Sequence, residues 1–200
     1  MSSVWFGEGV ADDGELRLCG DVTGKRAIEL GLSPTPHGVS ANAVVLARAG
    51  AKAIAVDPRP EAIAAIRQQA EAAEVRVECH QGELADLGFA TSGSVDLVVA
   101  ARTLDDVDDL PRLLRQVHRV LRPDAAFVMS ITHPVAAMFD PGTPTPVRPY
   151  GSTVRSISEL FASYERSNFR VDVVHELGPV GVRRPMVPSV LVVRARKLGV

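Results

Sequence analysis

The chain has 200 residues and a formal net charge of −2, and 46% of its residues are hydrophobic, 23% charged and 4% aromatic. This length predicts a single domain, residues 1–200, that can bury a core without disulfides or metals. The weakly acidic charge and the scarcity of aromatic rings argue against nucleic acid as a partner, because neither a basic surface nor a stacking platform is available.

Three further features bear on the compartment. Cys19 and Cys79 lie far apart and form no CxxC pair, which favours free thiols in a reducing cytoplasm. Residues 1–23, an N-terminal segment of the domain, lack a basic stretch followed by an apolar one, so we expect no signal peptide. No apolar run approaches the roughly 20 residues that cross a bilayer. We therefore expect a cytoplasmic protein without a membrane partner.

Short apolar runs alternate with helical patterns over the first two thirds of the chain. These runs predict five buried strands, at Arg26–Leu30, Lys52–Val56, Val75–Cys79, Val95–Ala100 and Ala125–Ile131. The helical patterns predict a helix at Ser40–Ala49 with Ser40 as N-cap, one that starts at Pro60, and one that carries Val107, Leu110, Leu114, Val117 and Leu121. Strands without polar alternation, separated by such helices, are typical of a parallel sheet covered on both faces.

The pattern changes after His133. Residues 138–155 contain four prolines and are predicted to form a loop, either a surface connection or a lid over the site. A helix at Ser156–Ser167 and strands at Phe169–His175 and Ser189–Ala195 follow. The stretch between the last two strands is too short and too rich in glycine and proline for a helix, which predicts an antiparallel hairpin. The expected fold is α/β, a doubly wound, mostly parallel seven-stranded sheet with an antiparallel last strand.

This order of elements, and four local sequences, resemble class I S-adenosylmethionine-dependent methyltransferases. The local sequences are Gly24–Gly31, Ala53–Ile63, Gly93–Ala100 and Leu113–Pro123, and the resemblance covers residues 22–197. It implies a Rossmann-like fold, S-adenosylmethionine as cofactor, and in-line methyl transfer to a small-molecule acceptor. In such a fold the ligand binds at the C-terminal ends of the strands.

The resemblance also implies a cofactor-binding loop after the first strand. In that family an acidic residue and two glycines occur there, and Glu29 and Gly31 match the first two of these positions. Ser33 stands where the second glycine is usual, and the inserted Pro34–Gly38 brings two prolines that lack an N–H donor. Either Leu32 and Ser33 offer their N–H groups to the methionine part of the cofactor while the inserted residues bulge away, or residues 34–36 fold into the cleft and fill it.

Three further segments carry residues that the resemblance places at the cofactor. The Asp57 carboxylate would accept hydrogen bonds from both ribose hydroxyls, with Pro58 beside it, although an aspartate is also common at a helix start. Glu83 matches the acidic residue that binds the adenine amino group, where aspartate is usual, and a solvated loop glutamate is the alternative. The other residues expected at the cofactor are Gly82, Leu84, Ala101 and Arg102.

One residue is a candidate for catalysis. His133 follows the fifth strand, where an imidazole could take a proton from the acceptor, but a histidine bonded to backbone is the alternative interpretation. No metal site is expected. Two other functions remain open: a non-catalytic binding or regulatory protein that has lost the cofactor, and a nicotinamide-dependent oxidoreductase, which lacks support because no GxGxxG follows the first strand.

Overall fold

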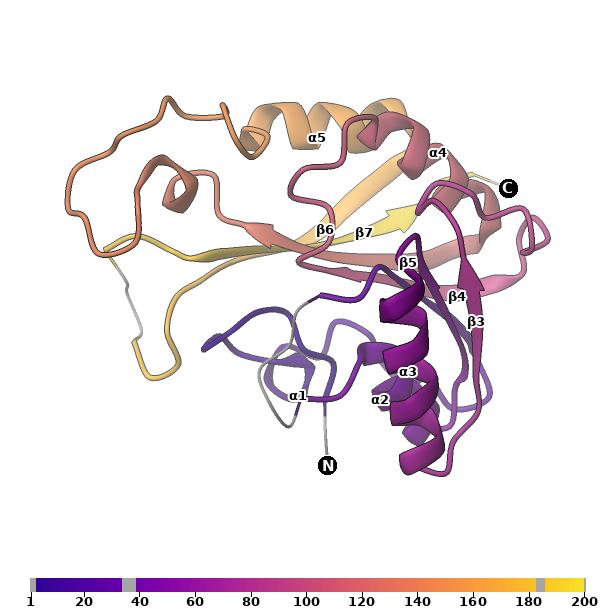
Figure 1. Cartoon of the computed structure of the whole chain (residues 1–200). Helices are drawn as coiled ribbons and strands as arrows, with labels where there is room; N and C mark the ends of the chain where they lie inside the picture. The colour runs from indigo at the N-terminus through magenta and orange to yellow at the C-terminus, as the bar shows by residue number, and fades with distance from the viewer. Residues whose placement is uncertain (1–2, 34–38, 183–185, 200) are drawn as a thin grey trace.

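The computed structural model describes residues 3–33, 39–182 and 186–199, and one seven-stranded sheet organises them (Figure 1). The strands in chain order are β1 Arg26–Leu30, β2 Lys52–Asp57, β3 Val77–Gln81, β4 Val95–Ala101, β5 Leu121–Thr132, β6 Phe169–Leu177 and β7 Val190–Lys197. Their order across the sheet is β3-β2-β1-β4-β5-β7-β6. Strands β1 to β5 pair in parallel, and β7 runs antiparallel between β5 and β6. The predicted fold class is confirmed.

Helices cover both faces of the sheet (Figure 1). They are α1 Asp13–Leu16, α2 Asn42–Arg48, α3 Pro60–Ala72, α4 Leu110–Val120 and α5 Ile157–Arg166, with a short 3-10 turn at Ala136–Met138. Helices α4 and α5 lie on one face, and α2 and α3 lie on the other together with the N-terminal segment. Within the described ranges, none of these helices combines the length and apolar character that crossing a membrane requires.

Two apolar layers form the core because successive residues of a strand point to opposite faces. In the first layer, Ile28 and Val98 of the sheet pack with residues of α4 and α5. In the second layer, Ala27 and Val99 pack with α2, α3 and Phe6 of the N-terminal segment. The N-terminal segment is therefore part of the cover on this face of the sheet.

Several predicted boundaries are shifted: Val107 and Leu121 lie outside α4, and β5 begins at Leu121 instead of Ala125. Two further shifts are at the starts of α2 and β3. Helix α2 begins at Asn42 with Ala41, not Ser40, as its N-cap, and no side chain of the N-cap residue binds the helix. The third strand begins at Val77 because the Val75 N–H still binds the Ala70 carbonyl at the end of α3, at 3.0 Å. Val75 therefore belongs to the C-terminal cap of α3, and pairing with the sheet starts two residues later.

The proline-rich stretch after β5 forms neither helix nor strand between Phe139 and Ser156. Arg148 holds its middle by hydrogen bonds to the carbonyls of Ala137 and Phe139. At its end, the Arg155 guanidinium donates to the carbonyl of Asp108, at 2.8 Å. This last contact joins the loop to the segment that precedes α4.

Candidate functional site

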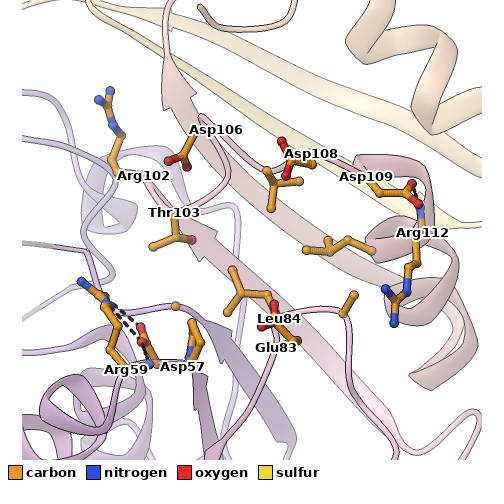
Figure 2. Close-up of a pocket in the computed structure, with 15 residues that line it drawn as sticks. Asp57, Arg59, Glu83, Leu84, Arg102, Thr103, Asp106, Asp108, Asp109 and Arg112 are labelled. Atoms are coloured by element: carbon orange, nitrogen blue, oxygen red, sulfur yellow. Dashed lines mark hydrogen bonds and ion pairs between the residues drawn. The ribbon is translucent and has the colours of Figure 1, made fainter.

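A cavity of about 620 Å³ lies at the C-terminal ends of the parallel strands. Its walls come from the segments that follow β1, β2, β3 and β4, and from the start of α4 (Figure 2). The lining residues are Gly31, Asp57, Pro58, Arg59, Glu83, Leu84, Ala85, Arg102, Thr103, Asp106, Val107, Asp108, Asp109, Arg112 and Leu113. Strand β1 pairs with both β2 and β4, so the cavity lies where the strand order reverses, the usual place for a ligand in an open α/β sheet.

Gly31 ends β1 in a conformation that favours glycine, with a φ of 76°. A Cβ at this position would lie 2.8 Å from the Cβ of Thr103, so a side chain would also collide. Thr103 is held there because its hydroxyl donates to the Leu30 carbonyl, at 2.6 Å. At the predicted glycine, the cavity is therefore lined by backbone atoms without a side chain.

Asp57 ends β2, and its carboxylate is almost fully buried. Oδ2 accepts hydrogen bonds from the Leu32 N–H at 2.7 Å and from the Arg59 guanidinium at 2.9 Å. Oδ1 accepts from the Arg59 backbone N–H at 2.8 Å and from its Nε at 3.0 Å. Burial acts to raise the pKa of Asp57, but these hydrogen bonds and the Arg59 charge outweigh it and hold the pKa below its ordinary value. The group is thus a carboxylate at neutral pH.

Glu29 lies behind the cavity and is not among the residues that line it. Its carboxylate accepts from the N–H of Asn42 at 3.0 Å and from that of Ala43 at 2.7 Å, so it caps α2. Burial raises the pKa of Glu29 to about 7 against the lowering effect of these two bonds, and the negative charge of Asp57 adds to the rise. Glu29 therefore stabilises the loop that carries Gly31 and is not positioned for direct contact with a ligand in the cavity.

The loop after β3 brings Glu83 and Leu84 to the cavity (Figure 2). Glu83 is exposed, and Leu84 is half-buried against the core. Gly82 does not line the cavity; its N–H binds the Asp57 carbonyl at 3.1 Å and joins the two strand ends. The structure therefore brings two of these three predicted residues to the site.

Of the two residues predicted to bind the cofactor near the end of β4, one lines the cavity and the other does not. Arg102 lines the cavity, whereas Ala101 is buried in the strand. In Figure 2 the Arg102 side chain points away from the cavity. Its guanidinium donates to the Thr132 hydroxyl at 2.6 Å and pairs with Asp105 at 3.3 Å. Arg102 therefore presents mainly its backbone to the site.

The loop that follows Gly31 is described only in part. Pro58 lines the cavity, and Ser33 is buried but is not among the lining residues. The Leu32 N–H, expected to face a cofactor, donates to Asp57 instead. The inserted Pro34–Gly38 lies outside the described residues.

His133 is buried at the end of β5 and does not line the cavity. Its Nδ1 accepts the Val135 N–H at 3.1 Å, so the proton of the neutral ring lies on Nε2, which donates to Glu176 at 2.9 Å. Both ring nitrogens are thus engaged with protein groups. The role as general base stays a prediction, and the geometry favours the structural interpretation.

Several lining residues were not predicted from the sequence. Arg59 comes two residues after Asp57, where the pattern indicates only a helix start. Asp106 and Asp108 come just before α4, where acidic residues are common, but only Asp109 caps this helix, through the Arg112 N–H at 2.8 Å. Their clustering just after a strand end was the signal that could have placed them at the ligand site.

Known proteins match both the sequence and the fold. Residues 37–129 match the family model described as a methyltransferase domain. A protein of Mycolicibacterium smegmatis, named "Probable S-adenosylmethionine-dependent methyltransferase", is 28% identical over 156 residues, which are 78% of this chain and 56% of that protein. A ubiquinone biosynthesis O-methyltransferase of Azorhizobium caulinodans is 35% identical over 88 residues, which are 42% of this chain and 33% of that protein.

Among solved structures, an S-adenosylmethionine-dependent methyltransferase from Mesorhizobium loti matches with a TM-score of 0.69 and 22% identity, over 92% of this chain and 96% of that one. At this identity the likeness concerns the fold. In sequence, the chain spans about half the length of the curated relatives that it matches first.

Proposed function

Because this chain belongs to the class I S-adenosylmethionine-dependent methyltransferases, we propose that it transfers a methyl group from S-adenosylmethionine to a small-molecule acceptor. One observation carries the proposal: the bare backbone of Gly31 and the carboxylate of Asp57 lie on the same cavity, at the reversal point of the sheet. The volume of about 620 Å³ falls within the range of about 300–1,000 Å³ that is usual for ligand pockets.

The residues fit an adenosyl cofactor by their chemistry. A buried carboxylate at a strand end can accept both hydroxyls of a ribose. The cavity is also lined by more carboxylates than guanidinium groups, and Figure 2 shows Asp106 and Asp108 beside it. This balance favours a cationic ligand such as a sulfonium.

The reaction would require little covalent chemistry from the protein. When bound, S-adenosylmethionine supplies a methyl group on a positively charged sulfur. Asp57 would hold the ribose, and the backbone at Gly31 would allow close approach of the methionine part. The loop at 138–155, whose Arg155 donates to the carbonyl of the lining residue Asp108, would help to exclude water. Alignment of donor and acceptor accounts for much of the rate in such a displacement, so no general base is required.

A small molecule is the proposed acceptor. The relatives named for ubiquinone biosynthesis are O-methyltransferases, which supports a hydroxyl group as the nucleophile. The absence of a net positive charge in the chain agrees with an acceptor other than nucleic acid.

Calorimetric titration with S-adenosylhomocysteine tests cofactor binding directly. We expect binding by the native chain and a loss of at least about tenfold in affinity in Asp57→Ala, since each bond from a hydroxyl to a charged acceptor contributes about 1.5 kcal/mol or more. Glu71→Ala, at an exposed position of α3, is the matched control and should bind as the native chain does.

Transfer is then assayed with methyl-labelled S-adenosylmethionine and catechol as a simple hydroxyl acceptor, with benzylamine as the amine comparison. Label in catechol supports the proposed reaction. No heat of binding at about 1 mM S-adenosylhomocysteine would contradict the proposal and favour a non-catalytic protein.

A further inference from the structure

We propose that Arg59 sets the affinity of the site, because its guanidinium occupies the positions on Asp57 that a ribose would need and must leave before the ribose can bind. This inference rests on the proposed function, since it concerns the same site. Arg59 was not among the residues predicted from the sequence.

The acceptor capacity of Asp57 is fully used. A carboxylate offers about four acceptor positions, two on each oxygen. Oδ2 receives the Leu32 N–H and one guanidinium nitrogen, at 2.7 and 2.9 Å. Oδ1 receives the Arg59 backbone N–H and Nε, at 2.8 and 3.0 Å. A ribose can therefore bind this carboxylate only by exchange with one of these donors.

The guanidinium is the donor that can leave. The two backbone N–H groups belong to the segments that directly follow β1 and β2, and they keep the carboxylate in place. By contrast, the side chain of Arg59 is 48% exposed, against 1% for that of Asp57, and can move into water. Besides Asp57, the guanidinium donates to the Leu32 carbonyl, at 2.5 Å.

The guanidinium also resembles the ligand that it would exclude. Its Nε and one terminal nitrogen form a planar fork that gives one bond to each carboxylate oxygen (Figure 2). The 2′- and 3′-hydroxyls of a ribose provide the same pair of neighbouring donors. Ribose binding then replaces the two hydrogen bonds from the guanidinium to Asp57 with two hydrogen bonds from the ribose hydroxyls. The measured affinity reflects the difference in free energy between these two pairs of bonds.

Removal of the competing pair should tighten binding. An ion pair with one exposed partner contributes about 1 kcal/mol or less, and somewhat more when it is bidentate, so Arg59→Ala should bind S-adenosylhomocysteine about three- to tenfold more tightly. Arg59→Lys, with a single ammonium that can hold only one of the two positions, should fall between the native chain and the alanine variant. Arg115→Ala, which removes a charge from an exposed position on α4, should leave the affinity unchanged.

A second ligand separates exchange from a general effect of charge. The 2′,3′-dideoxy analogue of S-adenosylhomocysteine keeps the charges but lacks both hydroxyls. If the hydroxyls replace the guanidinium, the gain from Arg59→Ala appears with the ribose ligand and disappears with the dideoxy analogue. An equal gain with both ligands would overturn the proposal, because it would show that only the charge of Arg59 matters.

The titrations also separate the inference from the proposed function. If the native chain binds S-adenosylhomocysteine and Arg59→Ala binds it equally or more weakly, with circular dichroism unchanged, the exchange is refuted and the proposed function stands. If only the arginine variants bind, Arg59 blocks the site in the native chain, so the exchange is supported while the proposed function of the native chain is contradicted. If no variant binds, both proposals fail, since Asp57 is then free and still takes no ribose.

Discussion

Glu29→Gln should change how the stability of the protein depends on pH. The Glu29 carboxyl is buried, and its pKa is raised from the ordinary value of 4.5 to about 7. The folded protein thus binds this proton more tightly than the unfolded chain does, so the resulting stability is present below pH 4.5 and is lost as the pH rises through about 7. Each pKa unit corresponds to about 1.4 kcal/mol, which gives about 3 kcal/mol over this interval.

The glutamine variant stays neutral at every pH and can still accept one of the two N–H bonds at the start of α2. Urea unfolding followed by circular dichroism at pH 5, 6, 7 and 8 gives the free energy of unfolding of both proteins. We expect the stability of the variant relative to the native chain to rise by about 3 kcal/mol between the lowest and highest pH. Glu71→Gln, at an exposed position, is the control and should show a constant difference. A constant difference for Glu29→Gln as well would refute the reasoning, since it would mean that Glu29 does not titrate in this range.

Two other substitutions test the packing around the site. Gly31→Ala should lower the free energy of unfolding in urea by about 2–4 kcal/mol, because alanine would adopt a left-handed conformation and would also collide with Thr103. Thr103→Gly in the same chain should recover the steric part of this loss. A loss below about 0.5 kcal/mol would contradict the described backbone. Asn42→Ala should cost about 1–3 kcal/mol, since its side chain makes two hydrogen bonds to the backbone of Trp5, at 2.8 and 3.0 Å. Hydrogen exchange should then be faster in the N-terminal segment than in β5, and uniform protection would show that Asn42 does not anchor that segment.

The elements of this fold were readable from the sequence because their signals are local. Apolar runs marked the strands, and Pro60 and Ser156 marked the starts of α3 and α5, where the structure has them. One exception is the start of α2: its first N–H groups are satisfied by Glu29, thirteen and fourteen residues away, and no nearby residue signals that contact. A helix end that is capped from another strand has no local sequence signature.

For the site, the sequence determined which residues come to the ends of adjacent parallel strands. Gly31 and Asp57 could be placed on one cavity because parallel strands in register bring their C-terminal ends together. The sequence did not determine what each side chain contacts there. Thr103 meets the end of β1 across 73 residues of chain, and Glu176 reaches His133 from β6. Those contacts depend on strand order, register and the path of each side chain, so only the tertiary structure could decide that Asp57 is held by Arg59 and that His133 is turned away from the cavity.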